Sequence, residues 1–400
     1  VIIDRHDALR MTFTPAGTEV CVTDDNDFQL EVRDVRDQSA AAQEESIQAL
    51  WSELANTPMN LIDGPLFRAI WLKLGDDSAE LLMSVHHVVC DGWSYYVILD
   101  ELSRILCGET ADLSEPPASF ADFAELQSAS AASNKDIDYW LDHFKTVPPA
   151  LDLPLDRPRP ATRTYAAARV DHRIDSDLTR LIRGAAGKYK ASIVNLVLAG
   201  VTVLLHRLSK ADDLAIGLPV ARQSTDNLPD LVGHGVQLLP VRVGISPNER
   251  FGDVVGRVKS AVLDASDHPN FTFGSLVREL NLSGDPSRVP LVPVIFNIDQ
   301  PSEDLKFGTA TASIRTIPRT AEGFEIFFNV LPSNDVLVVE TTFNTDLFDE
   351  ESIVSWLQAL ECILGDVAGE TDKAIEDIRL SPQTPACYET LNDTLRGHDH

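Results

Sequence analysis

Residues 81–94 read Leu-Leu-Met-Ser-Val-His-His-Val-Val-Cys-Asp-Gly-Trp-Ser, and we take this stretch as the key to the fold. Its apolar start predicts a buried strand that ends at two histidines, His86 and His87. Asp91 and Gly92 follow, and between residues 94 and 106 the apolar residues recur at helical spacing. A strand, a tight loop and a helix would present an imidazole on rigid elements, which suits a general base. Asp91 could orient the loop and pair with a distant cation.

Composition limits the classes of function. A chain of 400 residues predicts two domains, and 44% hydrophobic with 24% charged residues is typical of a soluble globular protein. The net charge of -29 argues against binding to nucleic acid or to an anionic membrane surface. No uncharged apolar run is long enough to predict a membrane span. Five scattered cysteines predict neither a disulfide framework nor a metal site, and we expect reduced thiols in a cytoplasmic protein.

The pattern His-His-x-x-x-Asp-Gly, formed by residues 86–92, resembles the motif of condensation domains of nonribosomal peptide synthetases. These domains belong to the chloramphenicol-acetyltransferase-like superfamily, in which His-x-x-x-Asp is the shared minimum. That minimum occurs by chance in many proteins, but the preceding apolar strand and the following Trp93 and Ser94 make the longer match specific. Two histidines at a strand end could also be structural core residues. The order of further matches along the chain favours the catalytic interpretation.

Residues 5–13 match the family pattern Arg-His-x-x-Leu-Arg-x-x-Phe, which leads into a first strand. The resemblance makes Arg5, or else Arg10, the expected cation for Asp91, in a buried pair that holds the loop in shape. Family members carry about one more helix and strand before this point. The start also lacks the features of a signal peptide, so we expect a piece of a longer chain.

Local patterns predict most of the secondary structure. Residues 18–35 contain β-branched pieces separated by acidic turns, which predicts a hairpin. The remaining expected elements are a helix at 41–56, a strand after the Asp-Gly-Pro turn at 63–65, a strand at 165–174, a helix at 192–207, a strand at 214–220, a hairpin at 324–343 and a helix at 350–364.

The domain boundaries follow from a proline-rich run and from the family resemblance. Residues 151–163 can form neither helix nor central strand, because proline lacks the backbone N–H. We therefore expect an N-terminal lobe at 1–150, a linker at 151–163 and a C-terminal lobe at 164–380. Residues 381–400 would lead toward an adenylation domain, because residues 391–394 resemble the start of such a domain. The resemblance implies an α/β (α+β) fold in which two chloramphenicol-acetyltransferase-like lobes form a V-shaped pseudo-dimer with a central tunnel.

The C-terminal half departs from the family pattern around His234. Residues 231–242 read Leu-Val-Gly-His-Gly-Val-Gln-Leu-Leu-Pro-Val-Arg, where the family often has Gly-x-Phe-Val-Asn-Thr. His234 is thus a departure, and we expect it to be structural rather than a second catalyst. Trp140, His234 and Asn297 are the candidates for lining the tunnel and meeting substrate.

The resemblance implies amide bond formation between a thioester donor and an amine, each carried on a phosphopantetheine arm. His87 would take the amine's proton or hold the amine by a hydrogen bond. The backbone N–H of Gly92 is a plausible oxyanion donor. His86 would support the loop, Asp91 would be structural, and Trp93 and Ser94 would assist. No metal and no cofactor of its own is expected. The expected partners are an upstream donor and a downstream acceptor carrier protein, and an adenylation domain in cis.

Three other functions remain open at this stage. An epimerisation domain shares the double histidine, and a free-standing acyl-CoA-dependent acyltransferase shares the superfamily motif, but neither would normally precede an adenylation-like tail. A catalytically inactive condensation-like domain that recruits partner enzymes is the non-enzymatic alternative, and an intact His87 and Asp91 argue against it. A heterocyclisation domain has aspartates in place of the histidines, so that function is excluded if His86 and His87 form the true motif.

Overall fold

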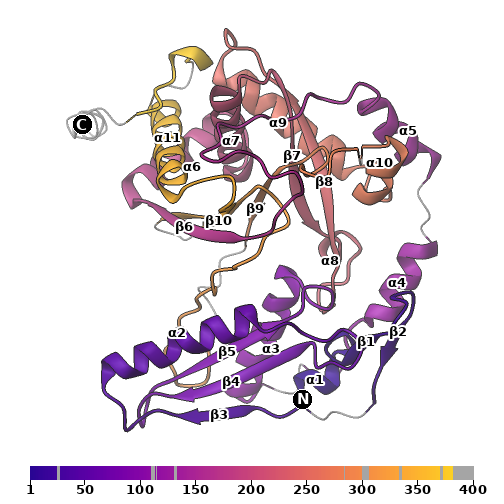
Figure 1. The fold of residues 1–400 in the computed structure, drawn as a ribbon, viewed down its shortest axis with the longest axis vertical. Helices are drawn as coiled ribbons and strands as arrows, with labels where there is room; N and C mark the ends of the chain where they lie inside the picture. Colours follow the sequence, from indigo (N-terminus) through magenta and orange to yellow (C-terminus); the bar gives the residue numbers. More distant parts are fainter. Residues whose placement is uncertain are drawn as a thin grey trace. The chain divides into compact units, whose positions relative to one another are not determined.

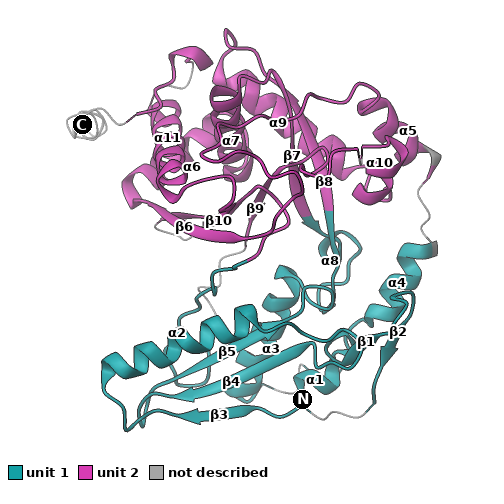
Figure 2. Ribbon diagram, in the orientation of Figure 1, with its two compact units in different colours: residues 1–131, 220–237, 302–320 teal, residues 132–219, 238–301, 321–400 magenta. Residues whose placement is uncertain are grey.

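The computed structural model describes residues 1–24, 28–109, 113, 115–129, 133–282, 284–299, 306–332, 336–369 and 373–381 (Figure 1). The chain divides into two compact units (Figure 2). The first unit consists of Val1–Ala131, Val220–Gln237 and Ser302–Thr320, and the second of Ala132–Pro219, Leu238–Pro301 and Ala321–His400. The expected adenylation-like tail at 391–394 lies outside the described residues.

The first unit is built on a three-stranded sheet in the order β3-β4-β5. Strand β4 (Phe67–Lys73) lies in the middle, parallel to β3 (Glu31–Asp34) and antiparallel to β5 (Ala79–Val85). Phe67 opposite Val85 sets the register, so the start of β4 lies beside the end of β5. The predicted strand before the histidines is thus confirmed.

Helices cover the two faces of this sheet because the side chains of β4 alternate between them. Ile70 and Leu72 pack with α2 (Ala40–Asn56), whereas Phe67 and Ala69 pack with α3 (Gly92–Cys107). Both helices have a side-chain N-cap, Ser39 for α2 and Asp91 for α3. The helices predicted at 41–56 and 94–106 are confirmed within one or two residues. The other elements here are α1 (Ile2–Arg5), η1 (Asp7–Arg10), α4 (Phe120–Ala129) and α8 (Arg222–Thr225).

The predicted hairpin at 18–35 is wrong. Strand β2 (Val20–Val22) pairs antiparallel with the preceding strand β1 (Met11–Phe13), and β3 pairs with β4 rather than with β2. The β-branched pieces do form strands, but both partners lie outside the expected segment. Local turn signals could not reveal this, because strand pairing is decided by which edges are available in the folded sheet.

The second unit contains a six-stranded sheet in the order β6-β11-β10-β9-β7-β8. Strand β9 runs parallel to β10 and β7, whereas β11 runs antiparallel to β10 and β6. The largely apolar helix α7 (Ile193–Ser209) packs with α9 and α11. The strands are β6 (Ala167–Ile174), β7 (Asp213–Ala221), β8 (Val236–Gly244), β9 (Val294–Ile298), β10 (Ile326–Pro332) and β11 (Leu337–Asn344). The remaining helices are α5 (Asn134–His143), α6 (Ser176–Lys188), α9 (Phe251–Ser266), α10 (Phe273–Glu279), α11 (Glu350–Gly369) and η3 (Ile375–Asp377).

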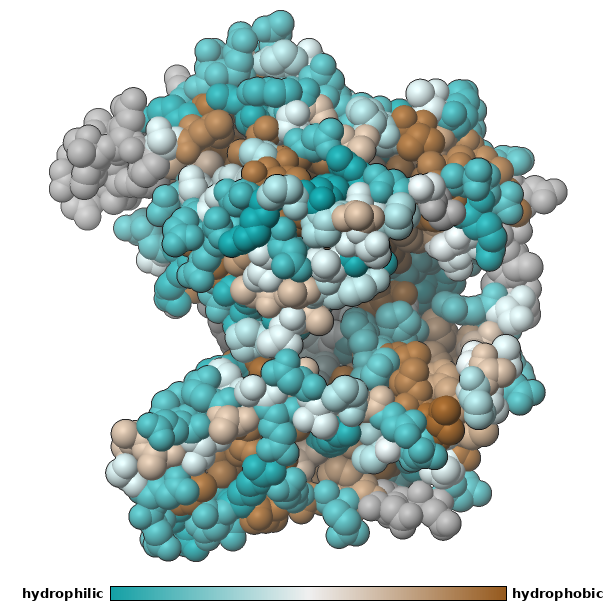
Figure 3. Space-filling model, viewed as in Figure 1, coloured by the Kyte–Doolittle hydropathy of each residue, from teal (hydrophilic) through white to brown (hydrophobic). Residues whose placement is uncertain are grey.

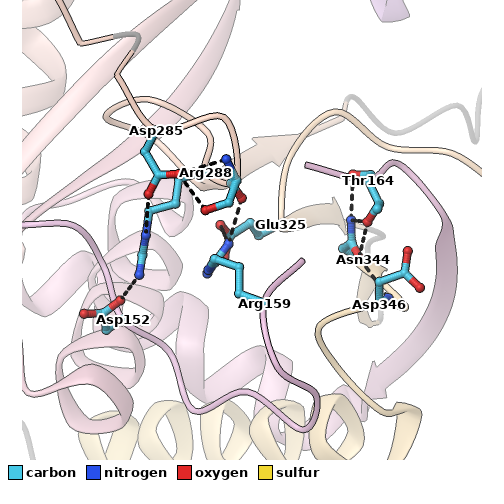
Figure 4. Close-up of polar contacts among 9 residues, drawn as sticks. Asp152, Arg159, Thr164, Asp285, Arg288, Glu325, Asn344 and Asp346 are labelled. Carbon is cyan, nitrogen blue, oxygen red and sulfur yellow. Dashed lines mark hydrogen bonds and ion pairs between the residues drawn. The ribbon is translucent and has the colours of Figure 1, made fainter. Parts of the chain in front are cut away.

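The proline-rich run forms neither helix nor strand, as expected, but the boundary between the units does not lie there. Residues 151–163 belong to the second unit, which begins at Ala132, and the first unit is discontinuous in sequence. Leu151 and Leu153 are buried, and Arg159 forms an ion pair with Glu325 at 2.7 Å (Figure 4). Because these contacts lie within the second unit, the run packs as part of that unit rather than as a free linker.

The surface agrees with the acidic composition. In the view of Figure 3 each unit shows mainly hydrophilic residues with smaller hydrophobic areas. Within the described ranges, no single helix is long and apolar enough to cross a membrane, although α6 and α7 taken together, with a 100° bend, have the length and composition to do so.

Candidate active site

The loop of the two histidines joins β5 to α3 and is held by its own backbone. The His86 N–H donates to the Leu66 carbonyl at 2.8 Å, which extends the strand pairing by one residue. The Val88 N–H donates to His86 Nδ1 at 3.1 Å, and the Val89 N–H donates to the His86 carbonyl at 3.0 Å. These three bonds make a tight turn in which His86 is the central support.

The two histidine rings differ in environment. His86 is partly buried, and this burial, together with the neighbouring His87, lowers the pKa of His86. A lowered pKa keeps that ring neutral near pH 7, as an acceptor at Nδ1 requires. His87 is exposed at the turn. Of the two rings, His87 is therefore the more accessible one.

Asp91 is buried and saturated by hydrogen bonds. Its Oδ1 accepts from Ser94 N and Oγ at 2.9 and 2.7 Å, and its Oδ2 accepts from Gln223 Nε2 and Gly235 N, both at 2.9 Å. Four donors match the acceptor positions of an ionised carboxylate, which donates nothing. The side chain is only 2% exposed, so it is occupied with holding the loop.

The expected ion pair between Asp91 and Arg5 is not formed. Arg5 donates from Nε to Glu101 at 2.7 Å and from a terminal nitrogen to the Leu113 carbonyl at 2.7 Å. His6 Nε2 lies 2.8 Å from the second oxygen of Glu101. The buried carboxylate that receives the cation therefore lies on the third turn of α3, ten residues after Asp91.

Arg10 is not the partner of Asp91 either. It donates to the backbone carbonyls of Ile3, Asp4 and Thr23. The family match had put a cation in the right region, but sequence could not tell which of two nearby carboxylates would receive it.

Glu101 is held ionised by its two basic partners. Burial alone would raise the pKa of this carboxyl, but the hydrogen bonds from His6 and Arg5 outweigh burial and lower the pKa. The contact ties the first turn of the chain, α1 and η1, to the middle of α3. Arg5 thus supports the loop indirectly, through the helix that follows it.

The segment Val220–Gln237 is the second support of the loop, and it belongs to the same unit. Trp93 Nε1 donates to the Pro229 carbonyl at 2.8 Å. The Gly233 N–H donates to Ser94 Oγ at 3.0 Å, and the Gly233 carbonyl lies 2.9 Å from the same oxygen, whose single proton goes to Asp91. Trp93 and Ser94 therefore fasten the start of α3 to this segment.

His234 lies beside His87, which sequence spacing did not predict. Their Nδ1 atoms are 3.2 Å apart, and the rings meet edge to face with centroids 4.9 Å apart. Partial desolvation and the neighbouring His87 lower the pKa of His234. The expectation that His234 is structural does not account for this contact.

Trp140 and Asn297, the other two tunnel candidates, belong to the second unit. Trp140 is 1% exposed, and its Nε1 donates to the His268 carbonyl at 2.9 Å, so it is a core residue there. Asn297 on β9 donates to Asn329 on β10 at 2.8 Å and to Asp299 at 3.0 Å.

Gln223 is the residue that sequence analysis missed. It is fully buried and orients its amide nitrogen toward Asp91, while its Oε1 has no hydrogen-bond partner among the described residues. A glutamine in a short helix carries no motif signal. The two glycines around His234 are the only sequence feature that pointed to this place, since a side chain at Gly235 would collide with Gln223.

The chemistry that the loop offers is that of an imidazole and backbone amides. Among the described residues, no group of three or more His, Cys, Asp or Glu side chains could hold a metal ion. Gly92 is exposed and is the first residue of α3, so its N–H is one that a helix leaves without an intrahelical partner. Burial raises the pKa of the Cys90 thiol, which disfavours a thiolate nucleophile.

Comparison with known proteins gives one family. A family model described as the condensation domain matches residues 1–386. A linear gramicidin synthase protein of Brevibacillus parabrevis is 30% identical over 397 residues, and a surfactin synthase protein of Bacillus subtilis is 29% identical over 398 residues. The alignments cover 95% and 98% of this chain but only 5% and 11% of those proteins. The chain therefore corresponds to a small part of each relative.

Solved structures share the fold. A four-domain nonribosomal peptide synthetase bound to AMP and glycine has a TM-score of 0.83 at 20% identity, covering 96% of this chain and 30% of that one. The X-domain from teicoplanin biosynthesis has a TM-score of 0.79 at 24% identity, covering 94% and 87%. The condensation domain of a monacolin K polyketide synthase has a TM-score of 0.81 at 20% identity, covering 94% and 88%. The predicted α/β fold class is thereby confirmed.

Proposed function

Because the chain belongs to the condensation-domain family of nonribosomal peptide synthetases, we propose that it forms amide bonds between two carrier-bound substrates. The donor is an acyl or peptidyl thioester on an upstream carrier protein, and the acceptor is the amine of an aminoacyl thioester on the downstream one. The partners are those carrier proteins and an adenylation domain in the same synthetase. Phosphopantetheine arrives as part of each substrate.

The observation that carries the proposal is that His87 is exposed on a loop in which His86, Asp91, Trp93 and Ser94 are held by hydrogen bonds. Asp91 is immobilised by four hydrogen bonds, His86 by three, and Trp93 and Ser94 are bound to a distant segment. A base held this firmly needs little reorganisation when the substrates arrive. The loop thus has the rigidity that general base catalysis requires.

The thioester needs little chemical activation, so much of the rate comes from bringing two tethered groups together. Positioning of this kind lowers a barrier by about 7–11 kcal/mol at best. The attacking amine develops a positive charge on nitrogen and must lose a proton. In the proposal, His87 accepts that proton or holds the amine by a hydrogen bond.

The developing oxyanion calls for a donor at the same place. The proposal assigns the exposed Gly92 N–H at the N-terminus of α3 to this role, where the helix dipole favours negative charge. Asp91 has no free acceptor position among its four hydrogen bonds, and its role in the proposal is to hold the loop.

A single-turnover assay tests the proposal. Donor and acceptor carrier proteins loaded with their substrates are mixed with the protein, and amide formation is followed by intact-protein mass spectrometry. We expect His87→Ala to slow the reaction about 10²- to 10⁴-fold without unfolding the protein. His87→Gln keeps hydrogen bonding but not proton acceptance, so partial activity in that variant would favour a positioning role.

The matched control is His172→Gln in the second unit, a histidine bound to Glu361 at 2.6 Å. It should leave the rate unchanged. No amide product from the unmodified protein with several loaded carriers would contradict the proposal and favour recruitment of a partner protein instead. Equal rates in the unmodified protein and both His87 variants would show that the motif is not part of the chemistry.

A further inference from the structure

The contact between His87 and His234 restricts the protons that the two rings can hold. The 3.2 Å between their Nδ1 atoms is a hydrogen-bond distance, and such a bond needs one donor and one acceptor. If both rings were doubly protonated, two N–H groups and two positive charges would face each other. The pair therefore holds one proton between the two Nδ1 atoms.

The position of His234 depends on the same residues that support His87. The flanking Gly233 donates its N–H to Ser94 Oγ at 3.0 Å, and Gly235 donates its N–H to Asp91 at 2.9 Å. The Gly235 N–H also lies 3.1 Å from the Gly233 carbonyl. The backbone on both sides of His234 is thus held against the N-terminus of α3, and this restricts the position of the His234 ring.

We propose that His234 is a positioning residue for His87: its Nδ1 accepts the Nδ1–H of His87 and so keeps the Nε2 of His87 free of a proton. The inference rests on the proposed amide-forming function and deepens it. In the reverse arrangement His234 donates, so a neutral His87 carries its proton on Nε2 and cannot accept another there. Only the first arrangement leaves His87 as a base.

The proton balance of the reaction fits this arrangement. The amine nitrogen attacks the thioester carbon, a C–N bond forms, and the proton lost by nitrogen moves to His87 Nε2. The resulting imidazolium still donates from Nδ1 to His234. When the C–S bond breaks, the departing thiolate takes the proton, which leaves an amide, a free thiol and neutral His87.

The electrostatic surroundings agree with the assignment of donor and acceptor. Desolvation and the adjacent His87 lower the pKa of His234, so His234 is the ring that stays neutral. Asp91 and a hydrogen bond with the His87 backbone oppose this effect, and His86, the other titratable neighbour of His87, is itself kept neutral. His234 is also one of the places where this chain departs from the family pattern, so the arrangement is a property of chains that carry histidine here.

Two substitutions separate the hydrogen bond from the bulk of the ring. Asparagine carries an oxygen at the same covalent distance from the backbone as histidine Nδ1, so His234→Asn retains an acceptor. His234→Leu fills similar space without one. Long-range proton–nitrogen NMR of histidine-labelled protein reads which nitrogen of His87 bears the proton, with its signals assigned by their loss in His87→Gln.

We expect the Nδ1–H form of His87 in the unmodified protein and in His234→Asn, and a shift toward the Nε2–H form in His234→Leu. In the carrier-protein assay, His234→Leu should react about 10- to 100-fold more slowly, the usual cost of losing an outer partner of a functional histidine. His234→Asn should recover most of the rate.

The NMR measurement does not depend on amide formation, so the two proposals fail separately. An unchanged His87 tautomer in all three proteins, or an Nε2–H form in the unmodified one, would overturn the role of His234. Equal rates for His234→Leu and the unmodified protein would overturn it as well. Absence of product from every protein would contradict the proposed function, while the tautomer measurement would still decide the contact.

Discussion

Asp91 Oδ2 accepts a hydrogen bond from Gln223 Nε2 at 2.9 Å, across 132 residues of sequence. The contact joins the loop after β5 to the short helix α8 within the first unit. Gly235 donates to the same oxygen, so one carboxylate oxygen organises both segments. An aspartate expected to neutralise an arginine is instead held by an amide, a hydroxyl and two backbone N–H groups.

The first prediction concerns the saturation of Asp91. In Asp91→Asn, either orientation of the amide sets its NH₂ group against two donors, because each oxygen of Asp91 accepts two bonds. We expect the free energy of unfolding to fall by about 1–3 kcal/mol, as for a buried donor left unpaired. Urea denaturation measures this, and the exposed Asp77→Asn serves as control. A variant as stable as the control would mean that the loop relaxes freely.

The second prediction separates the two arginines near the N-terminus. Arg5→Ala removes a charged partner of Glu101, which is 4% exposed, so we expect a loss of about 3–5 kcal/mol in the free energy of unfolding, with His6 able to reduce it. Arg10→Ala removes only hydrogen bonds to backbone carbonyls and should cost about 1 kcal/mol. Equal losses in denaturation experiments would contradict the assignment of the buried pair to Arg5.

The third prediction concerns Gly235. A Cβ at this position would lie 2.5 Å from the Cδ and Oε1 atoms of Gln223. Gly235→Ala should therefore displace Gln223 from Asp91 and lower the free energy of unfolding by about 1–3 kcal/mol. The control is Gly256→Ala on α9, where a Cβ meets nothing within 4 Å and helix propensity favours alanine.

A double-mutant cycle tests the cause. If the clash is with Gln223, then Gly235→Ala should cost much less in a Gln223→Ser background, which gives a coupling energy of the two sites. Additive effects would place the strain of Gly235→Ala elsewhere in the loop.

The fourth prediction concerns pH. Burial lowers the pKa of His86, His143 and His234, and the neighbouring charges of His87 and Arg242 contribute to the shifts. Unfolded histidines titrate near 6.5, so just below that pH the unfolded chain binds more protons than the folded one. The contribution of these groups to the free energy of unfolding therefore falls as pH is lowered from about 7 to 5.

Urea denaturation at several pH values measures this slope. We expect His143→Gln to flatten it, because this substitution removes one of the three shifted groups without touching the loop at His87. A slope unchanged by His143→Gln would contradict the assigned burial effect at that position.

Local sequence pattern was enough for the elements around the loop. The apolar run before His86 forms β5, and the helical spacing after Ser94 forms α3, because both periodicities reflect which side chains face a core. The structure adds that Asp91 is the N-cap of α3, with its Oδ1 accepting from the Ser94 N–H. The order of family motifs also predicted the fold class.

Partners distant in sequence were decided only by the tertiary structure. Neither the pairing of β2 with β1 nor the packing of residues 151–163 within the second unit has a local cause. Arg5 meets Glu101 rather than Asp91, since α3 presents Glu101 to α1 while Asp91 is already enclosed by backbone and amide donors. His234 reaches His87 because two glycines fasten its backbone to the start of α3. Periodicity records which face of an element is buried, but the identity of a buried partner follows from how remote segments pack, and the sequence holds that information only through the whole fold.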